Sequence, residues 1–324
     1  MIYGDISPRT AAYVTADLLK RAVPYLILEK FGQTKPLPSR STRSMVFRRY
    51  NALANTPVAL TEGVTPAGKT LTKTDITVTI SQYGDFVGLT DVIMDTHEDP
   101  VMQESSAILA EQAAQMLELV RWNVLKGGSN VFYANGSARN AVNTAISRAM
   151  QRKVTKMLKR QNAKPITSVV RSTPSYGTIN VKPSYIGVGH ADIQNDVEDM
   201  TGFKPVENYG TLTPYDNEIG SVGEVRYVTS TLFSPFIDAG GAKGLMESTT
   251  GTSADVYPVL YLGTDSWACV PLKGKDAIMP VVVNPKPVQG DELGQRGSVG
   301  WKAYHACVIL NDAWMCRGEV AVTA

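Results

Sequence analysis

Residues 71–81 read LTKTDITVTIS and decide the fold. Within them Ile76, Val78 and Ile80 alternate with threonines, the period-two pattern of a β-strand. Residues 45–50, MVFRRY, are the second strand candidate, and the link between the two is polar and rich in proline and glycine. We predict a long hairpin. Because two strands alone are marginally stable, the hairpin needs a partner surface on its own chain or on another copy.

Residues 99–126 are the strongest helix candidate, since apolar side chains recur at helical spacing and Gly127-Gly128 follows. Further helices are predicted over 137–160 and near 191–200, and strand patterns dominate from Gly210 onward. The strand candidates there are 225–228, 256–262, 267–270, 278–283, 301–310 and 319–322. A helix predicted within residues 7–31, the hairpin, the later helices and then strands indicate an α+β fold rather than alternating βαβ units.

Composition narrows the class of protein. The chain has 324 residues, enough for one large or two ordinary domains, and its net charge of +2 argues against a dedicated DNA-coating protein. No run of about 18 apolar residues is present, so no membrane span is expected. Cys269, Cys307 and Cys316 are an odd number of cysteines, which favours a reducing compartment and unpaired thiols.

Charge is segregated along the chain. Residues 119–191 hold twelve basic and no acidic side chains, whereas residues 192–224 hold eight acidic side chains and one basic. Three interpretations stay open: solvated helix faces, a surface that faces phosphates, and complementary contacts between copies of the chain.

The strongest motif match is Gly63–Thr70, GVTPAGKT, which fits the P-loop pattern of nucleotide-binding proteins. A P-loop needs a helix after it, because the helix N-terminus holds the phosphates. Residues 71–80 have a strand pattern instead, so we interpret the match as the tip of the hairpin.

Catalytic and metal-binding patterns are thin. His305, Cys307 and Cys316 could form a thiolate-imidazole site, although such residues more often pack in a strand-rich core. Asp192 and Asp196 share a helix face without a third ligand. We therefore predict no catalytic residue, no cofactor and no metal site.

Three stretches resemble a known family: Ala16 to Gln33, Met45 to Leu53, and the run from Leu60-Thr61-Glu62-Gly63 through Ile80-Ser81-Gln82-Tyr83-Gly84 to Thr90-Asp91. They are similar to the major capsid proteins of tailed bacteriophages, in particular the podophage coat family typified by coliphage N-four. The E-G, P-x-G, Q-Y-G and T-D elements occur in order. Beyond Gly128 the resemblance is one of layout.

The resemblance implies an α+β Hong Kong-type phage major capsid fold with four parts. They would be an N-terminal arm over 1–33, an extended hairpin loop over 34–85, a peripheral domain over 86–185 and 285–324 with a spine helix at about 99–127, and an axial domain over 186–284. Residues 285–324 would return to the sheet of the peripheral domain.

The implied function is a major capsid protein that self-assembles into the icosahedral shell around a double-stranded DNA genome, without catalysis. Its location would be the virion capsid, assembled in the host cytoplasm. Expected partners are copies of itself in pentamers and hexamers, packaged DNA held without sequence preference, and a portal; Met1 lies close to the arm, from which we expect a separate scaffolding protein. Whether a decoration protein binds stays open. The alternatives are an encapsulin-like compartment shell and a P-loop nucleotide hydrolase using residues 63–70.

Two groups of basic residues are candidate contacts. Intersubunit contacts are expected from Arg48, Arg49 and Lys69 in the loop. A surface that faces either DNA or a neighbour's acidic patch is expected from Arg152, Lys153, Lys156, Lys159 and Arg160.

Overall fold

The computed structural model describes residues 26–40, 42–57, 59–65, 68–96, 101–167, 183–209, 214–273, 278–287 and 290–324. The helices are α2 Asp91–Thr96, α3 Val101–Leu125, α4 Arg148–Arg160 and α5 Gln194–Glu198. Short 3₁₀ turns are η2 Leu28–Phe31, η3 Arg139–Ala141, η4 Ala191–Ile193, η5 Val206–Tyr209 and η6 Asp312–Trp314. The strands are β1 Gln33–Thr34, β2 Ser44–Tyr50, β3 Lys73–Thr79, β4 Ser81–Thr90, β5 Val131–Tyr133, β6 Tyr185–His190, β7 Phe203–Pro205, β8 Glu218–Val222, β9 Val225–Ser230, β10 Tyr257–Leu262, β11 Trp267–Cys269, β12 Met279–Val283, β13 Arg296–His305, β14 Cys307–Ile309 and β15 Met315–Val320.

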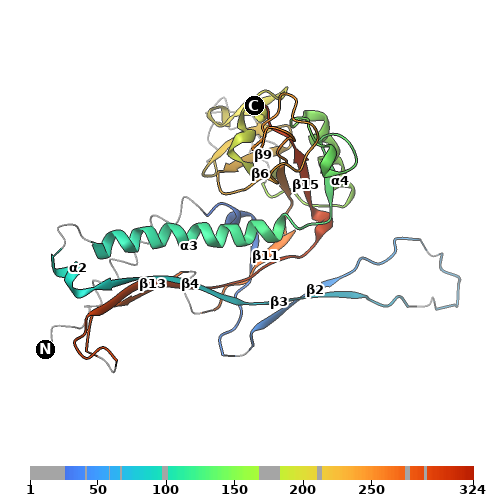
Figure 1. Ribbon diagram of the computed structural model, residues 1–324. Coiled ribbons are helices and arrows are strands. Elements are labelled where there is room, and N and C mark those ends of the chain that lie inside the picture. The colour runs from blue at the N-terminus through green and yellow to red at the C-terminus, as the bar shows by residue number, and fades with distance from the viewer. Residues whose placement is uncertain are drawn as a thin grey trace, which may run out of the picture.

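The strands form four sheets, in the orders β5-β15-β10-β6-β9-β8-β7, β12-β13-β4, β1-β11-β14 and β2-β3. Figure 1 shows α3 lying along β4 and β13, and we call this part the body. The seven-stranded sheet and α4 make a lobe above one end of α3 (Figure 1). Beyond the same end, β2 and β3 extend as a long hairpin.

The body is held together by a face of small residues on α3. Ala110, Ala113 and Ala114 are fully buried and pack with Val299 and Trp301 of the sheet. Alanines at this spacing let the helix approach the sheet closely. The helix predicted over 99–126 is therefore confirmed as Val101–Leu125, and residues 97–100 lie outside the described part.

The lobe buries both faces of its sheet. On one face, α4 packs Met150, Val154 and Leu158 into a core. On the other, Trp122 and Leu125 from the end of α3 join a second core. Burial on both faces explains why the central strands β6 and β10 are almost entirely buried.

The small sheet β1-β11-β14, which we call the junction sheet, connects the hairpin to the rest of the chain. Its central strand β11 is buried throughout. On one side, Trp267 and Cys269 pack with α3 and the lobe. On the other, Ala268 packs with Phe47 and Val78 of the hairpin. One strand thus belongs to two cores.

The predicted hairpin is confirmed, and it is continuous with the body. In β2 and β3, residues Ser44 to Tyr50 pair with Thr79 to Lys73 in antiparallel register. A single residue, Ile80, separates β3 from β4, which pairs with β13 along its whole length. The chain therefore changes partner strands at residue 80.

Two sequence predictions need correction. Residues 137–147 are not α-helical: Ser147 accepts a hydrogen bond from the N–H of Met150 and caps α4 there. The preceding residues are held by long-range contacts, since Ala145 bridges Ala321 and the side chains of Asn135 and Asn143 bond each other. In addition, β1, β4, β5, β6, β7 and β8 were not predicted as strands.

The predicted boundaries of the domains stay predictions, but the pairing of strands differs from them in two places. Residues 279–283 were expected in the axial domain, yet β12 pairs with β13 beside α3. Residues 315–320 were expected in the sheet of the peripheral domain. Instead, β15 pairs with β10 and β5 in the lobe, where all six of its residues are buried. The expected arm over 1–33 lies mostly outside the described residues.

A buried carboxylate fixes the start of the described chain to α3. Glu118 accepts hydrogen bonds from the backbone N–H groups of Ile27 (3.1 Å) and Leu28 (2.7 Å). Arg121, one turn further on, donates to Glu118 (3.1 Å) and to Glu29 (3.1 Å). Burial raises the pKa of Glu118, while Arg121 and the two N–H groups oppose that rise.

Replacing Glu118 by Ala is expected to lower the free energy of unfolding by about 3–5 kcal/mol, because the buried Arg121 loses its buried carboxylate partner and two buried N–H groups lose their acceptor. Glu118→Gln keeps a carbonyl acceptor and should lose less. Urea denaturation of the two variants measures the difference. Equal losses would show that the acceptor atoms for Ile27 and Leu28 do not matter.

Candidate functional site

The hairpin carries the first candidate surface. Its outer half exposes apolar side chains that a monomer would leave in water: Tyr50, Leu53, Leu60, Val64 and Leu71, with Leu60 77% exposed. The described polar contacts of the tip stay inside the hairpin, for instance Asn51 N–H to Thr72 O (2.9 Å) and Val64 N–H to Thr61 O (3.1 Å). Apolar groups in such a position are typical of a contact surface for another chain.

The three basic residues predicted as contacts in the loop differ in their surroundings. Arg48 is bound to Asp75 on the opposite strand through Nε–Oδ1 (2.9 Å) and Nη2–Oδ2 (3.2 Å). Lys69 Nζ donates to the carbonyl oxygen of Ala54 (2.7 Å) and so joins the two sides of the tip. Arg49 is exposed on β2 and makes no ion pair with any described residue. Of the three side chains, it is the one without a polar partner in the described part of the chain.

The P-loop interpretation lacks its structural context. Described residues 68–72 form no helix, and strand β3 follows at Lys73. Lys69 is engaged by Ala54 rather than directed into a ring of backbone N–H groups. Residues 66 and 67 lie outside the described part. The tip of a hairpin, as predicted, accounts for the described residues of the motif.

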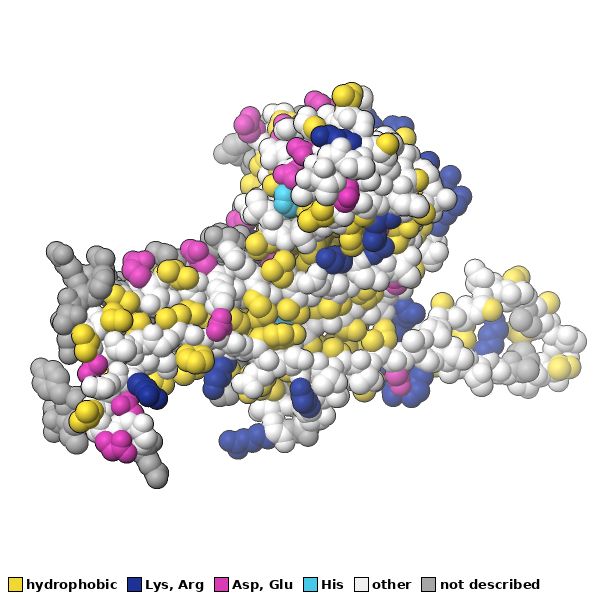
Figure 2. All heavy atoms as spheres, in the orientation of Figure 1, with side chains coloured by type: hydrophobic (Ala, Val, Ile, Leu, Met, Phe, Trp, Pro, Cys, Tyr) yellow, Lys and Arg dark blue, Asp and Glu magenta, His cyan; other side chains and the backbone are white. Residues whose placement is uncertain are grey.

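Helix α4 carries the second candidate surface. Its buried side is apolar apart from Gln151, and its other side turns basic residues outward. Arg148, Arg152, Lys156 and Arg160 recur every fourth residue and make one row along the helix. In Figure 2, Lys and Arg gather on the edge of the lobe where Figure 1 places α4.

This row lines a groove of about 700 Å³ between α4 and the β8–β9 turn, which we call the basic groove. Gly223, at φ +62°, makes the tight turn that brings Glu224 against the helix. Of the five predicted residues, the structure brings four to the groove, namely Arg152, Lys156, Lys159 and Arg160. Lys153 does not line it.

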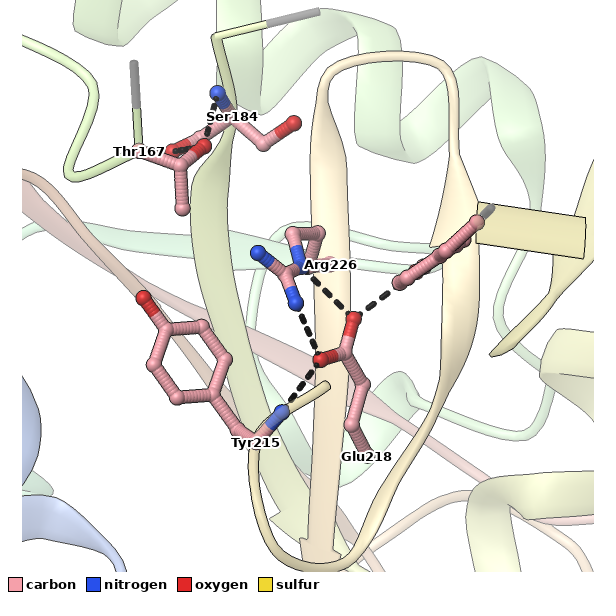
Figure 3. Close-up of polar contacts among 6 residues, drawn as sticks. Thr167, Ser184, Tyr215, Glu218 and Arg226 are labelled. Carbon is pink, nitrogen blue, oxygen red and sulfur yellow. Dashed lines mark hydrogen bonds and ion pairs between the residues drawn. The ribbon is translucent and has the colours of Figure 1, made fainter. Parts of the chain in front are cut away.

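The acidic stretch that follows in sequence is largely used inside the chain. Figure 3 shows Glu218 of β8 bound side-on by Arg226 of β9, with Nε–Oε1 at 2.6 Å, and accepting from the N–H of Tyr215 (2.9 Å). Glu224 pairs with Lys159 (2.6 Å), and Asp192 accepts from the hydroxyl of Tyr257 (2.9 Å).

Because these carboxylates already have partners, they offer little to a neighbouring chain. The basic and acidic stretches instead pair with each other within one molecule at one point, the ion pair between Lys159 and Glu224. In the rest of the basic groove, Arg148 donates to the carbonyl oxygen of Thr201, while Arg152, Lys156 and Arg160 are exposed.

The third surface, which the sequence did not indicate, is the face of the sheet β12-β13-β4 turned away from α3. Gly84 and Gly300 keep it low, while Phe86 is 71% exposed and Val283 is also exposed. A shallow groove of about 600 Å³ runs across it. Figure 2 shows apolar side chains spread along the body. Along β4, polar, glycine and apolar residues are mixed, so the sequence shows no regular alternation from which this face could be predicted.

Chemistry that would point to an enzyme is sparse in the described residues. Among them, no group of three or more His, Cys, Asp or Glu side chains is placed to hold a metal ion. In the same residues no helix combines the length and apolar character needed to cross a membrane. His305 and Cys307 do lie in one buried region with Cys269, whereas Cys316 belongs to a different core.

Comparison with known proteins identifies the family. Residues 73–317 match a family model described as phage capsid protein. A search of curated proteins finds no match.

Solved structures agree with the fold. The structure titled "Capsid of Ralstonia phage GP4" superposes with a TM-score of 0.70 at 13% identity, covering 91% of this chain and 90% of that one. The structure titled "Cyanophage Pam1 capsid asymmetric unit" gives 0.67 at 14% identity, covering 94% and 92%. The head of Helicobacter pylori bacteriophage KHP40 gives 0.59 at 13% identity, covering 89% and 87%. At these identities the likeness shows a shared fold.

The basic groove predicts that two nearby lysines of α4, Lys153 and Lys156, contribute differently to DNA binding. Lys156→Glu and Lys153→Glu change the net charge equally, but only Lys156 lines the groove. We expect Lys156→Glu to weaken binding of a short DNA duplex about tenfold at low salt and to flatten the salt dependence, with a smaller effect of Lys153→Glu. Fluorescence anisotropy measures both. Equal weakening would mean that net charge alone governs binding.

Proposed function

Because the chain belongs to the phage capsid protein family, we propose that it is the major capsid protein of a tailed bacteriophage. Copies of it assemble into the icosahedral shell that encloses the double-stranded DNA genome. The observation that carries this proposal is a capsid fold spanning nearly the whole chain, with a hairpin that exposes apolar side chains beyond its own body.

The body and the lobe correspond to the peripheral and axial domains of that fold. The pairing of strands supports assigning β12, β13 and β4 with α3 to the peripheral domain, and β5 to β10 with β15 to the axial domain. The chain crosses between the two parts after α3, after β10 and after β14. The predicted boundaries would shift accordingly.

Contacts between subunits rest on the hairpin. Its exposed apolar tip and the open sheet face around Phe86 are two surfaces of matching character on one molecule. Packing the hairpin of one subunit on the sheet face of the next would bury both, and the same contact could repeat around a ring. Arg49 is the basic loop residue most available for such a contact, and Arg48 and Lys69 would contribute by holding the hairpin in shape.

The basic groove supports a surface that meets packaged DNA without sequence preference. Its cations form a row, and Glu218 and Glu224 of the acidic stretch are paired inside the chain. The alternative, that the basic groove binds an acidic patch of a neighbouring subunit, is weaker because these carboxylates already have partners within their own chain. Lys153, outside the groove, would add only to the general positive potential.

The remaining expectations complete the proposal. The protein works without catalysis, in the virion capsid, after assembly in the host cytoplasm with a separate scaffolding protein and a portal. An encapsulin-like compartment shares the fold, and nucleic acid within purified particles distinguishes the phage shell from it.

Electron microscopy of the purified full chain, mixed with scaffolding protein if required, tests the function. Uniform closed shells or ring-shaped capsomers are expected. A monomer that stays unassembled at high concentration under both conditions would overturn the proposal.

Replacing Pro57 to Thr70 by an Asn-Gly turn should leave the monomer folded, because the described contacts of the tip are internal to the hairpin. Assembly is expected to fail, since the exposed apolar tip is lost. Circular dichroism checks the fold, and sedimentation velocity measures assembly. The full-length variant Arg49→Glu tests the same contact without a deletion. Shells of normal yield from both variants would remove the hairpin from the mechanism.

A further inference from the structure

Two of the three cysteines are neighbours on adjacent strands of the junction sheet. Cys269 of β11 and Cys307 of β14 are directly opposite in antiparallel register, and both are free thiols. The next pair, Val270 and Ala306, exchanges both backbone hydrogen bonds, with Val270 N–H to Ala306 O at 2.9 Å and Ala306 N–H to Val270 O at 3.3 Å. The cysteines therefore occupy a non-hydrogen-bonded pair, where Cα atoms lie about 4.5 Å apart. That separation is within the range that a disulfide spans.

The two side chains point to the same side of the sheet. Both pack in the core formed by α3 and the lobe, together with Trp267 and Ile309. Cys269 is 4% exposed, whereas Cys307 is partly exposed. A small disulfide that reaches the pair would therefore come from the side of Cys307.

The surroundings make Cys269 the more acidic thiol. Cys307 donates a hydrogen bond to it and lowers its pKa, and His305 and Arg121 lower it further against the effect of burial. By contrast, burial raises the pKa of Cys316, in β15, to about 12. The thiolate is the reactive form in disulfide exchange, so Cys269 would react before Cys316.

We propose that Cys269 and Cys307 form an intrachain disulfide when the protein meets a small-molecule disulfide such as oxidised glutathione. The Cys269 thiolate attacks one sulfur of the small disulfide and releases one small thiolate. Cys307 then loses its proton, and its sulfur attacks Cys269 in the mixed disulfide and releases the second. Two protein thiols lose two electrons, and one small disulfide is reduced to two thiols.

The bond would act on the connection between lobe and body. The chain leaves the lobe between β10 and β11 and returns to it between β14 and β15. Cys269 and Cys307 lie on the strands next to these two crossings. A covalent link between them would restrict rotation of the lobe on the body. Its formation on release from a reducing cytoplasm rests on the proposed function, but the bond itself does not.

The test uses the purified, reduced full chain in dissociated form, so that it does not depend on assembly. Thiol titration in denaturant should count three thiols before treatment with oxidised glutathione and one after it. Peptide mapping should join the Cys269 and Cys307 peptides and leave Cys316 free. The thermal midpoint should rise by several degrees on oxidation and return on reduction.

The variants separate the steps. Cys307→Ser should accumulate glutathione at Cys269, and Cys316→Ser should still lose two thiols. Three thiols persisting in the wild-type chain, a bond to Cys316, or disulfide-linked dimers as the main product would overturn the proposal. The mapping of the wild-type chain decides the matter even if a serine variant does not fold.

Discussion

The strand β11 is buried on both sides, and much of the rest of the molecule depends on that arrangement. Trp267 and Cys269 belong to the core shared by α3 and the lobe, while Ala268, between them, belongs to the core at the base of the hairpin. Because successive side chains of a strand point to opposite faces, three residues are enough to join two cores. A shift in register by one residue would exchange the two sets of side chains and disrupt both cores.

The direction of the hairpin is set by the sheet of the body, because β3 continues directly into β4. Strands β3 and β4 are separated only by Ile80, which is buried in the core at the base of the hairpin, so the ladder with β13 passes into the ladder with β2 with little interruption. The body thus extends its own sheet outward as a two-stranded ribbon. Phage capsid proteins of low sequence identity share this fold with the chain, and a projecting element anchored in the core is well suited to linking subunits.

Local patterns account for what the sequence predicted correctly. The hairpin and α3 have strong periodicity and clear ends, with alternation in Ile76, Val78 and Ile80 and a glycine pair after Lys126. Strand β6 was missed because its glycines look like a loop, although a Cβ at Gly189 would lie only 2.5 Å from Cδ1 of the buried Ile193. Residues 137–147 have an alanine pattern typical of a helix, but pairing of Ala145 with Ala321 prevails over it.

The same distinction holds for the candidate sites. The row of cations on α4 follows from their spacing alone, whereas the groove needs the β8–β9 turn, which is far away in sequence. The partner of Arg48 could be anticipated only from the register of the hairpin. The open sheet face and the apposed cysteines depend on which strands pair, and single-chain patterns do not reveal that.

The exposed tip of the hairpin also has a consequence for the free subunit. Its apolar side chains stay exposed in the single chain, so contact with another molecule would link the order of the tip to concentration by mass action. At low copy number the ribbon should exchange amide hydrogens rapidly, and protection should increase as subunits associate. The same exposed edges could join chains in the wrong order, so the rate at which subunits are supplied becomes part of the specificity of assembly.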